Sequence, residues 1–145
     1  MRHLFFVSSV ATLTLSACCS TGPESKDEAA PLIYFLEIVT PDVNENCSAL
    51  EKLHGIRFGE PIAELGNARM AVTPDNGRIS IRAPMRADEA PVVRPYLLVD
   101  DIEAAVKAAA AAGGQIAMGA EELPGGLGKF AIYLQGGIQY GLWEL

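Results

Sequence analysis

The fold is decided by residues 94–116, RPYLLVDDIEAAVKAAAAAGGQI, in which a short apolar run is followed directly by an alanine-rich stretch. The apolar run, extended by one residue to VRPYLLV at 93–99, predicts a strand. Asp100 or Asp101 is placed to cap a helix, the alanines favour that helix, and Gly113 ends it. The stretch therefore predicts a strand that leads at once into a helix.

The same order of elements is expected twice along the chain. The first half predicts a strand, a helix that ends at Gly55, and three short strands, over residues 32–40, 41–55, 58–63, 66–73 and 77–83. After its own strand and helix, the second half predicts strands over residues 115–119, 129–135 and 138–144. The turn Asp75-Asn76-Gly77 is a strong hairpin signal. The sequence thus predicts an α+β domain, residues 32–145, built from two βαβββ modules over 32–85 and 92–145.

The N-terminal region is expected to be an export signal followed by a tether. MRH supplies positive charge, and LFFVSSVATLTLSA is apolar but too short for a comfortable membrane span. Leu15-Ser16-Ala17-Cys18 resembles the lipobox of bacterial lipoproteins, which implies loss of residues 1–17 and lipid modification of Cys18. Residues 18–31 then read as a polar tether that holds the domain at a membrane of the bacterial cell envelope. Ordinary secretory cleavage after Ala17 is the alternative.

Composition argues against a nucleic-acid partner. The 145 residues carry a net charge of -7, and the eleven Lys and Arg are scattered with no run of three.

Of the three cysteines, Cys47 is the only one inside the expected domain, so no disulfide can form there, and packing is its expected role. His54 stands at the end of the first helix, where a histidine more often interacts with carbonyl groups than takes part in catalysis. These features leave a small-molecule partner as the main expectation.

The duplicated arrangement, with VTPD and LVDD at matching places after the first strand of each half, resembles the vicinal oxygen chelate superfamily, which includes glyoxalase I and bleomycin-resistance proteins. The second half, through LPGG, KFAIYLQGG and GLWEL, is the closer match. The resemblance implies a mixed sheet curled around a ligand cleft, with the helices outside. It also implies a divalent metal in many members and clefts that are often built at dimer contacts, so a homodimer is a further expectation.

The metal positions implied by this resemblance carry unsuitable side chains. Phe35 and Arg94 stand seven residues before Asp42 and Asp101, where the opening strands of the superfamily place a ligand. Gly141 stands four residues after Gly137, and Ser80 is the matching place in the first half. Neither an apolar ring, a guanidinium nor a glycine offers the imidazole or carboxylate that such metals need. We therefore expect no metal or other cofactor.

Strand alternation gives the set of residues expected to face the cleft. Its members mix aromatic walls with a hydroxyl, one carboxylate and two guanidinium groups: Phe35, Glu37, Ser80, Arg82, Arg94, Tyr96 and Trp143. The same alternation places Glu144 on the other face, as an exposed terminal carboxylate. A one-residue change of register would bring Glu144 into the cleft and expel Trp143.

Three functions follow from this set. The first is a binding module for a small organic molecule, in which Arg94 holds a carboxylate or phosphate while Tyr96 and Trp143 stack on a planar group. The second is a glyoxalase-type lyase, isomerase or dioxygenase with displaced metal ligands, or with Glu37 as base and Arg94 as oxyanion partner. The third is a structural or protein-binding role in the envelope, in which Glu37 and an arginine only neutralise one another.

Overall fold

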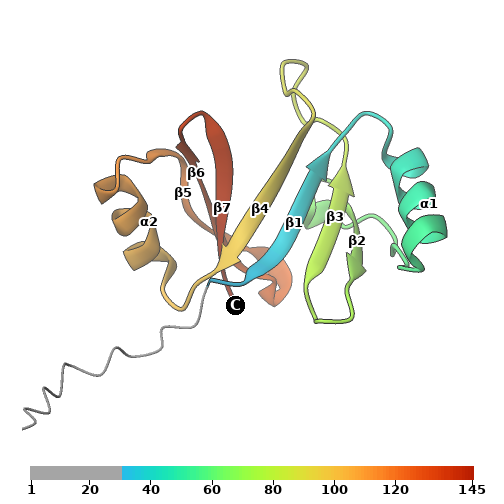
Figure 1. Ribbon diagram of the computed structural model, residues 1–145, viewed down its shortest axis with the longest axis horizontal. Coiled ribbons are helices and arrows are strands. Elements are labelled where there is room, and N and C mark those ends of the chain that lie inside the picture. Colours follow the sequence, from blue (N-terminus) through green and yellow to red (C-terminus); the bar gives the residue numbers. More distant parts are fainter. Residues whose placement is uncertain (1–30) are drawn as a thin grey trace, which may run out of the picture.

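The computed structural model describes residues 31–145, which form one mixed sheet of seven strands with two helices (Figure 1). The signal and nearly all of the tether expected from the sequence lie outside the described residues. Along the chain the elements are β1 (Ile33–Val39), α1 (Val43–His54), η1 (Ala63–Leu65), β2 (Arg69–Val72), β3 (Arg78–Arg82), β4 (Val92–Leu98), α2 (Ile102–Ala111), β5 (Gln115–Leu123), η2 (Pro124–Gly126), β6 (Gly128–Gln135) and β7 (Ile138–Glu144). Within residues 31–145 no helix is both long and apolar enough to cross a membrane.

The sheet has the strand order β2-β3-β1-β4-β7-β6-β5. Its centre is the antiparallel pair β1 and β4, the opening strands of the two halves, with Glu37 opposite Arg94. Each opening strand also runs parallel to the closing strand of its own half, β1 beside β3 and β4 beside β7. Figure 1 shows the two halves on either side of this central pair. The expected α+β architecture with a curled mixed sheet is confirmed.

The first half has one strand fewer than the sequence predicts. Residues 58–63 lie along β2 but make only isolated contacts, from Gly59 N–H to the Met70 carbonyl at 2.9 Å and from Ile62 N–H to the Ala68 carbonyl at 2.9 Å. Pro61 stands between these two donors and has no N–H, so a continuous ladder cannot form. The strand prediction for residues 58–63 is wrong, and the chain instead turns through η1.

The two helices cover the convex face of the sheet, one over each half (Figure 1). Between α1 and the sheet, Cys47 of α1 and Ile81 of β3 are fully buried in one cluster, so the expected packing role of Cys47 is confirmed. Between α2 and the sheet, the core contains Ile102 of α2 and Leu142 of β7. Since residues that alternate with these must point the other way, the helix-side cores fix which side chains enter the concave face.

Glu144 lies on the helix side of the sheet and contacts the start of α2, whose N-cap is Asp101. Its carboxylate accepts hydrogen bonds from the Ile102 N–H at 2.8 Å and from the Lys129 ammonium at 2.7 Å. These donors, first the ammonium and then the N–H, lower the pKa of the Glu144 carboxyl. The alternative register that brings Glu144 into the cleft is wrong. The expectation of an exposed terminal carboxylate is also wrong, because only 20% of this side chain is exposed.

Candidate functional site

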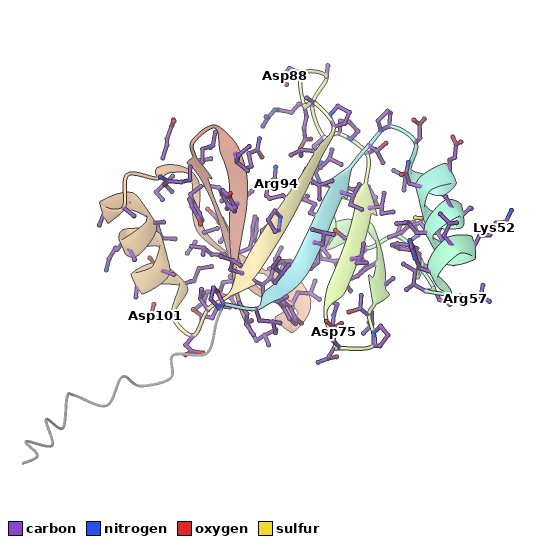
Figure 2. The ribbon with its side chains drawn as sticks, viewed as in Figure 1. Lys52, Arg57, Asp75, Asp88, Arg94 and Asp101 are labelled. Carbon is purple, nitrogen blue, oxygen red and sulfur yellow. The ribbon has the colours of Figure 1, made fainter. Side chains whose placement is uncertain are left out.

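A cavity of about 170 Å³ opens on the concave face of the sheet. All seven residues that strand alternation assigns to the cleft line it, and they come from the four central strands: Phe35, Glu37, Ser80, Arg82, Arg94, Tyr96 and Trp143. Each of the seven is at least nine-tenths buried. In Figure 2, Arg94 is labelled on β4 at the centre of the sheet. The structure therefore gathers the whole predicted set in one place.

Three aromatic rings form one wall of the cavity. Phe35 stacks on Trp143 with ring centroids 4.6 Å apart and planes inclined by 12°. Tyr96 meets both rings edge-on, at 5.4 Å from Phe35 and 5.8 Å from Trp143. Such edge and offset contacts add to the stabilisation that burial alone provides. One face of the Trp143 indole is thus already covered by Phe35, which leaves less of the ring for stacking on a ligand than the sequence suggested.

Glu37 is the hub of a buried ionic network. Its Oε1 accepts from Arg82 Nε at 2.6 Å, and its Oε2 accepts from Arg94 Nη1 and from the Tyr96 hydroxyl, the latter at 2.9 Å. The side chains of Glu37, Arg82 and Arg94 are 10%, 7% and 6% exposed. Burial, together with the Glu37 charge, raises the pKa of the Tyr96 hydroxyl well above its usual value, so the tyrosine stays a neutral donor.

Both guanidinium groups have further partners. Arg94 donates through Nε and Nη2 to the side-chain carbonyl of Gln139 on β7, with the Nε bond at 3.0 Å. Arg82 forms a two-point pair with Glu89, from Nη1 to Oε2 at 3.0 Å and from Nη2 to Oε1 at 2.7 Å. All three nitrogens of each arginine are engaged, so a ligand anion at Arg94 would have to displace a partner that is already in place.

The arrangement disfavours Glu37 as a general base. Its two oxygens accept three hydrogen bonds, two of them from permanently charged guanidinium groups. A Glu37 that took up a proton would no longer carry the charge that neutralises these guanidinium groups, which would leave buried cations without their counterion. Together with Glu89, the network provides an electrically balanced floor for the cavity.

The remaining lining is mostly apolar and was not assigned from the sequence. It includes the following side chains: Leu65, Met85, Met118, Leu123, Phe130 and Ile132. Phe130 and Ile132 could have been assigned to the cleft by strand alternation, because β6 pairs with β7 and Phe130 lies opposite Trp143. No periodic signal exists for Leu65 in η1, nor for Glu89, which does not line this cavity but reaches Arg82 from the loop between β3 and β4.

The aromatic cluster also includes Tyr34, which strand alternation assigns to the other face. Its ring lies 6.1 Å from that of Trp143. The register of β1 against β4 shifts between Ile33 and Phe35, so neighbouring residues can both reach the concave side. A β-bulge of this kind cannot be recognised in the sequence of an apolar strand.

Comparison with solved structures finds the same fold at low sequence identity. A hypothetical protein from Bacillus halodurans aligns with a TM-score of 0.64 and 11% identity, over 81% of this chain and 96% of that one. Methylmalonyl-CoA epimerase from Streptomyces coelicolor, in complex with 2-nitronate-propionyl-CoA, gives 0.57 and 16% over 77% and 95%. The Mycobacterium tuberculosis epimerase gives 0.57 and 16% over 76% and 85%. The chain has the vicinal oxygen chelate fold. No protein-family model matches the sequence, and neither does any curated protein sequence.

The residues at the metal positions that the sequence resemblance implied have side chains or surroundings that suit a metal poorly. Arg94 brings a positive charge to one of them, and Phe35 brings an apolar ring to another. At Gly141 a Cβ atom would lie 2.0 Å from the ring of Tyr96, so the tyrosine already fills the space that a ligand side chain would need. Within residues 31–145 no group of three His, Cys, Asp or Glu side chains gathers.

Proposed function

We propose that this vicinal oxygen chelate domain is a binding module that holds a small organic molecule with an apolar body in its cleft. The observation that carries the proposal is a cavity of about 170 Å³ whose lining is mostly apolar and whose buried charges are already paired. An apolar protein cavity of roughly 150 Å³ is known to take up benzene. The cleft is therefore suited to a ligand with one ring or a short branched chain.

Binding is better supported than proton transfer because of how Glu37 is held. The enzymatic alternative, a lyase, isomerase or dioxygenase of glyoxalase type, needs a free base or a set of metal ligands. Glu37 is fixed by Arg82, Arg94 and Tyr96, and the structural neighbours are too distant to transfer an activity. Stoichiometric Ni, Zn, Mn or Fe in the purified protein, lost in Glu37→Gln, would favour the enzyme instead.

We also propose that this module is tethered to a membrane of the bacterial cell envelope. The lipobox-like segment supports lipid modification of Cys18 and a domain tethered to the envelope membrane of a bacterium. Radiolabelled palmitate should enter the protein, and Cys18→Ala should release it from membranes. Unchanged membrane attachment of Cys18→Ala would contradict this part of the proposal and leave the binding module untouched.

A thermal-shift experiment with toluene tests the binding module. Toluene should raise the melting temperature of the purified protein in a saturable manner, because a ligand that binds only the folded state stabilises it. Ala68 is 2% exposed and lines the cavity, so Ala68→Leu should fill the site and abolish the shift. The matched control is Ala63→Leu in η1, which is exposed and outside the lining, and it should keep the shift. An equal shift in both variants would contradict the proposal.

A further inference from the structure

The charges that the sheet itself contributes to the cleft do not balance. β3 and β4 bring the guanidinium groups of Arg82 and Arg94, whereas β1 brings the single carboxylate of Glu37. Strand residues alone would leave one buried positive charge without a counterion, which is costly in a poorly solvated site. The second negative charge comes from Glu89, which belongs to no strand.

The contacts of the Glu89 side chain are those that a protein typically makes with the carboxylate of a bound ligand. Its two oxygens face Nη1 and Nη2 of Arg82, and Oε2 also accepts from the Met85 N–H at 2.7 Å. Arg82 Nε points the other way and is committed to Glu37 at 2.6 Å. A two-point guanidinium contact supplemented by a backbone N–H is a common way for proteins to recognise a carboxylate.

These donors lie where two cavities meet. The 170 Å³ apolar cavity and an outer cavity of about 540 Å³ share five lining residues: Arg82, Met85, Arg94, Met118 and Ile132. Glu89 borders only the outer cavity. A molecule whose carboxylate took the place of the Glu89 carboxylate on Arg82 would therefore have the apolar cavity beside its body.

The segment that carries Glu89 is a loop rather than part of the sheet. Residues 83–91 join β3 to β4 and include no helix or strand, and Figure 2 shows Asp88 at their outermost turn. Within this loop Met85 is 62% exposed, and the ion pair of Arg86 with Asp88 is on the surface. Glu89 is thus held by its contacts with Arg82 and the Met85 N–H and not by the hydrogen-bond ladders of the sheet, so its displacement from Arg82 would not require a strand to separate.

We propose that Arg82 and the Met85 N–H are the carboxylate subsite of the cleft, that Glu89 occupies it in this structure, and that the ligand is a small monocarboxylate with an apolar body. This inference rests on the proposed binding function and names its ligand class. The sequence suggested Arg94 as the partner of a ligand carboxylate. We assign this role instead to Arg82, because its Nη1 and Nη2 face a carboxylate that belongs to a loop rather than to the sheet.

Benzoate and benzamide, which differ in charge but hardly in shape, test the inference. Trp143 is the only tryptophan, so the protein gives one indole N–H resonance, and this resonance reports on the cavity wall. Glu89→Gln removes the competing carboxylate and should tighten benzoate binding at least tenfold relative to the unmodified protein. Benzamide binding should change less than twofold. Glu60→Gln, an exposed glutamate outside both cavities, is the matched control and should change neither.

The outcomes separate this inference from the proposed function. If toluene binds but Glu89→Gln binds benzoate no more tightly than the unmodified protein, the carboxylate subsite is wrong and the binding module stands. If toluene, benzoate and benzamide all fail to bind, both are wrong. Should Glu89→Gln fold poorly, Glu89→Ala provides the second test: formate should raise its melting temperature and chloride at equal ionic strength should not. Equal effects of formate and chloride would overturn the subsite.

Discussion

Replacing Glu37 by glutamine should lower the free energy of unfolding by about 3–5 kcal/mol, the usual cost of breaking a buried ion pair from one side. Glu37 is 8% exposed and accepts from Arg82, Arg94 and Tyr96. Glutamine keeps the shape but removes the charge and turns an NH₂ group toward hydrogen-bond donors. Glu89 is then the only carboxylate left for two buried guanidinium groups. Against a typical domain stability of about 5–15 kcal/mol, the loss is large.

Urea denaturation followed by the fluorescence of Trp143 measures this loss. With a slope of roughly 2 kcal/mol per M, the midpoint should fall by about 2 M and the slope should stay the same. Glu64→Gln, on an exposed glutamate at the rim of the cavity, is the control and should change the stability by less than about 0.5 kcal/mol. A fall of under about 1 kcal/mol in Glu37→Gln would refute the view that the network is a charge-balanced floor.

Three further predictions concern the surroundings of the network. Gly141→Ala should destabilise the fold by about 1–3 kcal/mol, because the new methyl group meets the Tyr96 ring, whereas Gly119→Ala has open space and should not; urea midpoints compare them. Arg82 lowers the pKa of the Glu89 carboxyl to about 2 from a usual 4.5. The ionised Glu89 should therefore make the unmodified protein more stable than Glu89→Gln by at most roughly 3 kcal/mol in free energy of unfolding. This difference should be full above pH 4.5 and vanish as the pH falls through 2. Urea unfolding at several pH values measures it, and a difference that does not change with pH would contradict the prediction. Glu144→Gln should weaken amide-exchange protection in the first turn of α2 and leave toluene binding unchanged, since Glu144 lies on the helix side; lost binding would contradict this placement.

Strand alternation was enough to predict the composition of the cleft floor. Once the helix-side residues of a strand are buried under a helix, every second residue must enter the concave face. Ile81 and Leu142 are such helix-side residues, and their neighbours Arg82 and Trp143 enter the cavity as expected. The duplicated strand-helix order predicted two βαβββ modules, and the resemblance to the vicinal oxygen chelate superfamily implied that they form one curled mixed sheet, as β1 and β4 do at its centre.

What the sequence did not reveal depends on contacts between distant segments. Residues 58–63 were predicted to be a strand because they contain apolar residues and glycine, but Pro61 interrupts the hydrogen-bond ladder with β2. Only the position of β2 shows which residue would have to donate a backbone N–H there. Tyr34 joins the aromatic cluster around Trp143 at a register shift in β1 that the apolar run does not reveal. Glu89 comes from a loop that has no period at all. The pairing of Glu89 with Arg82 therefore had to be seen in three dimensions.

The position of bound toluene tests the central claim most directly. Nuclear Overhauser effects from the toluene protons should appear at the ring of Phe130, the side chain of Ile132 and the indole of Trp143, all of which line the cavity. The same Overhauser effects should disappear in Ala68→Leu. Overhauser effects to Ile102 and Leu142 under α2, or none at all at saturating toluene, would contradict it.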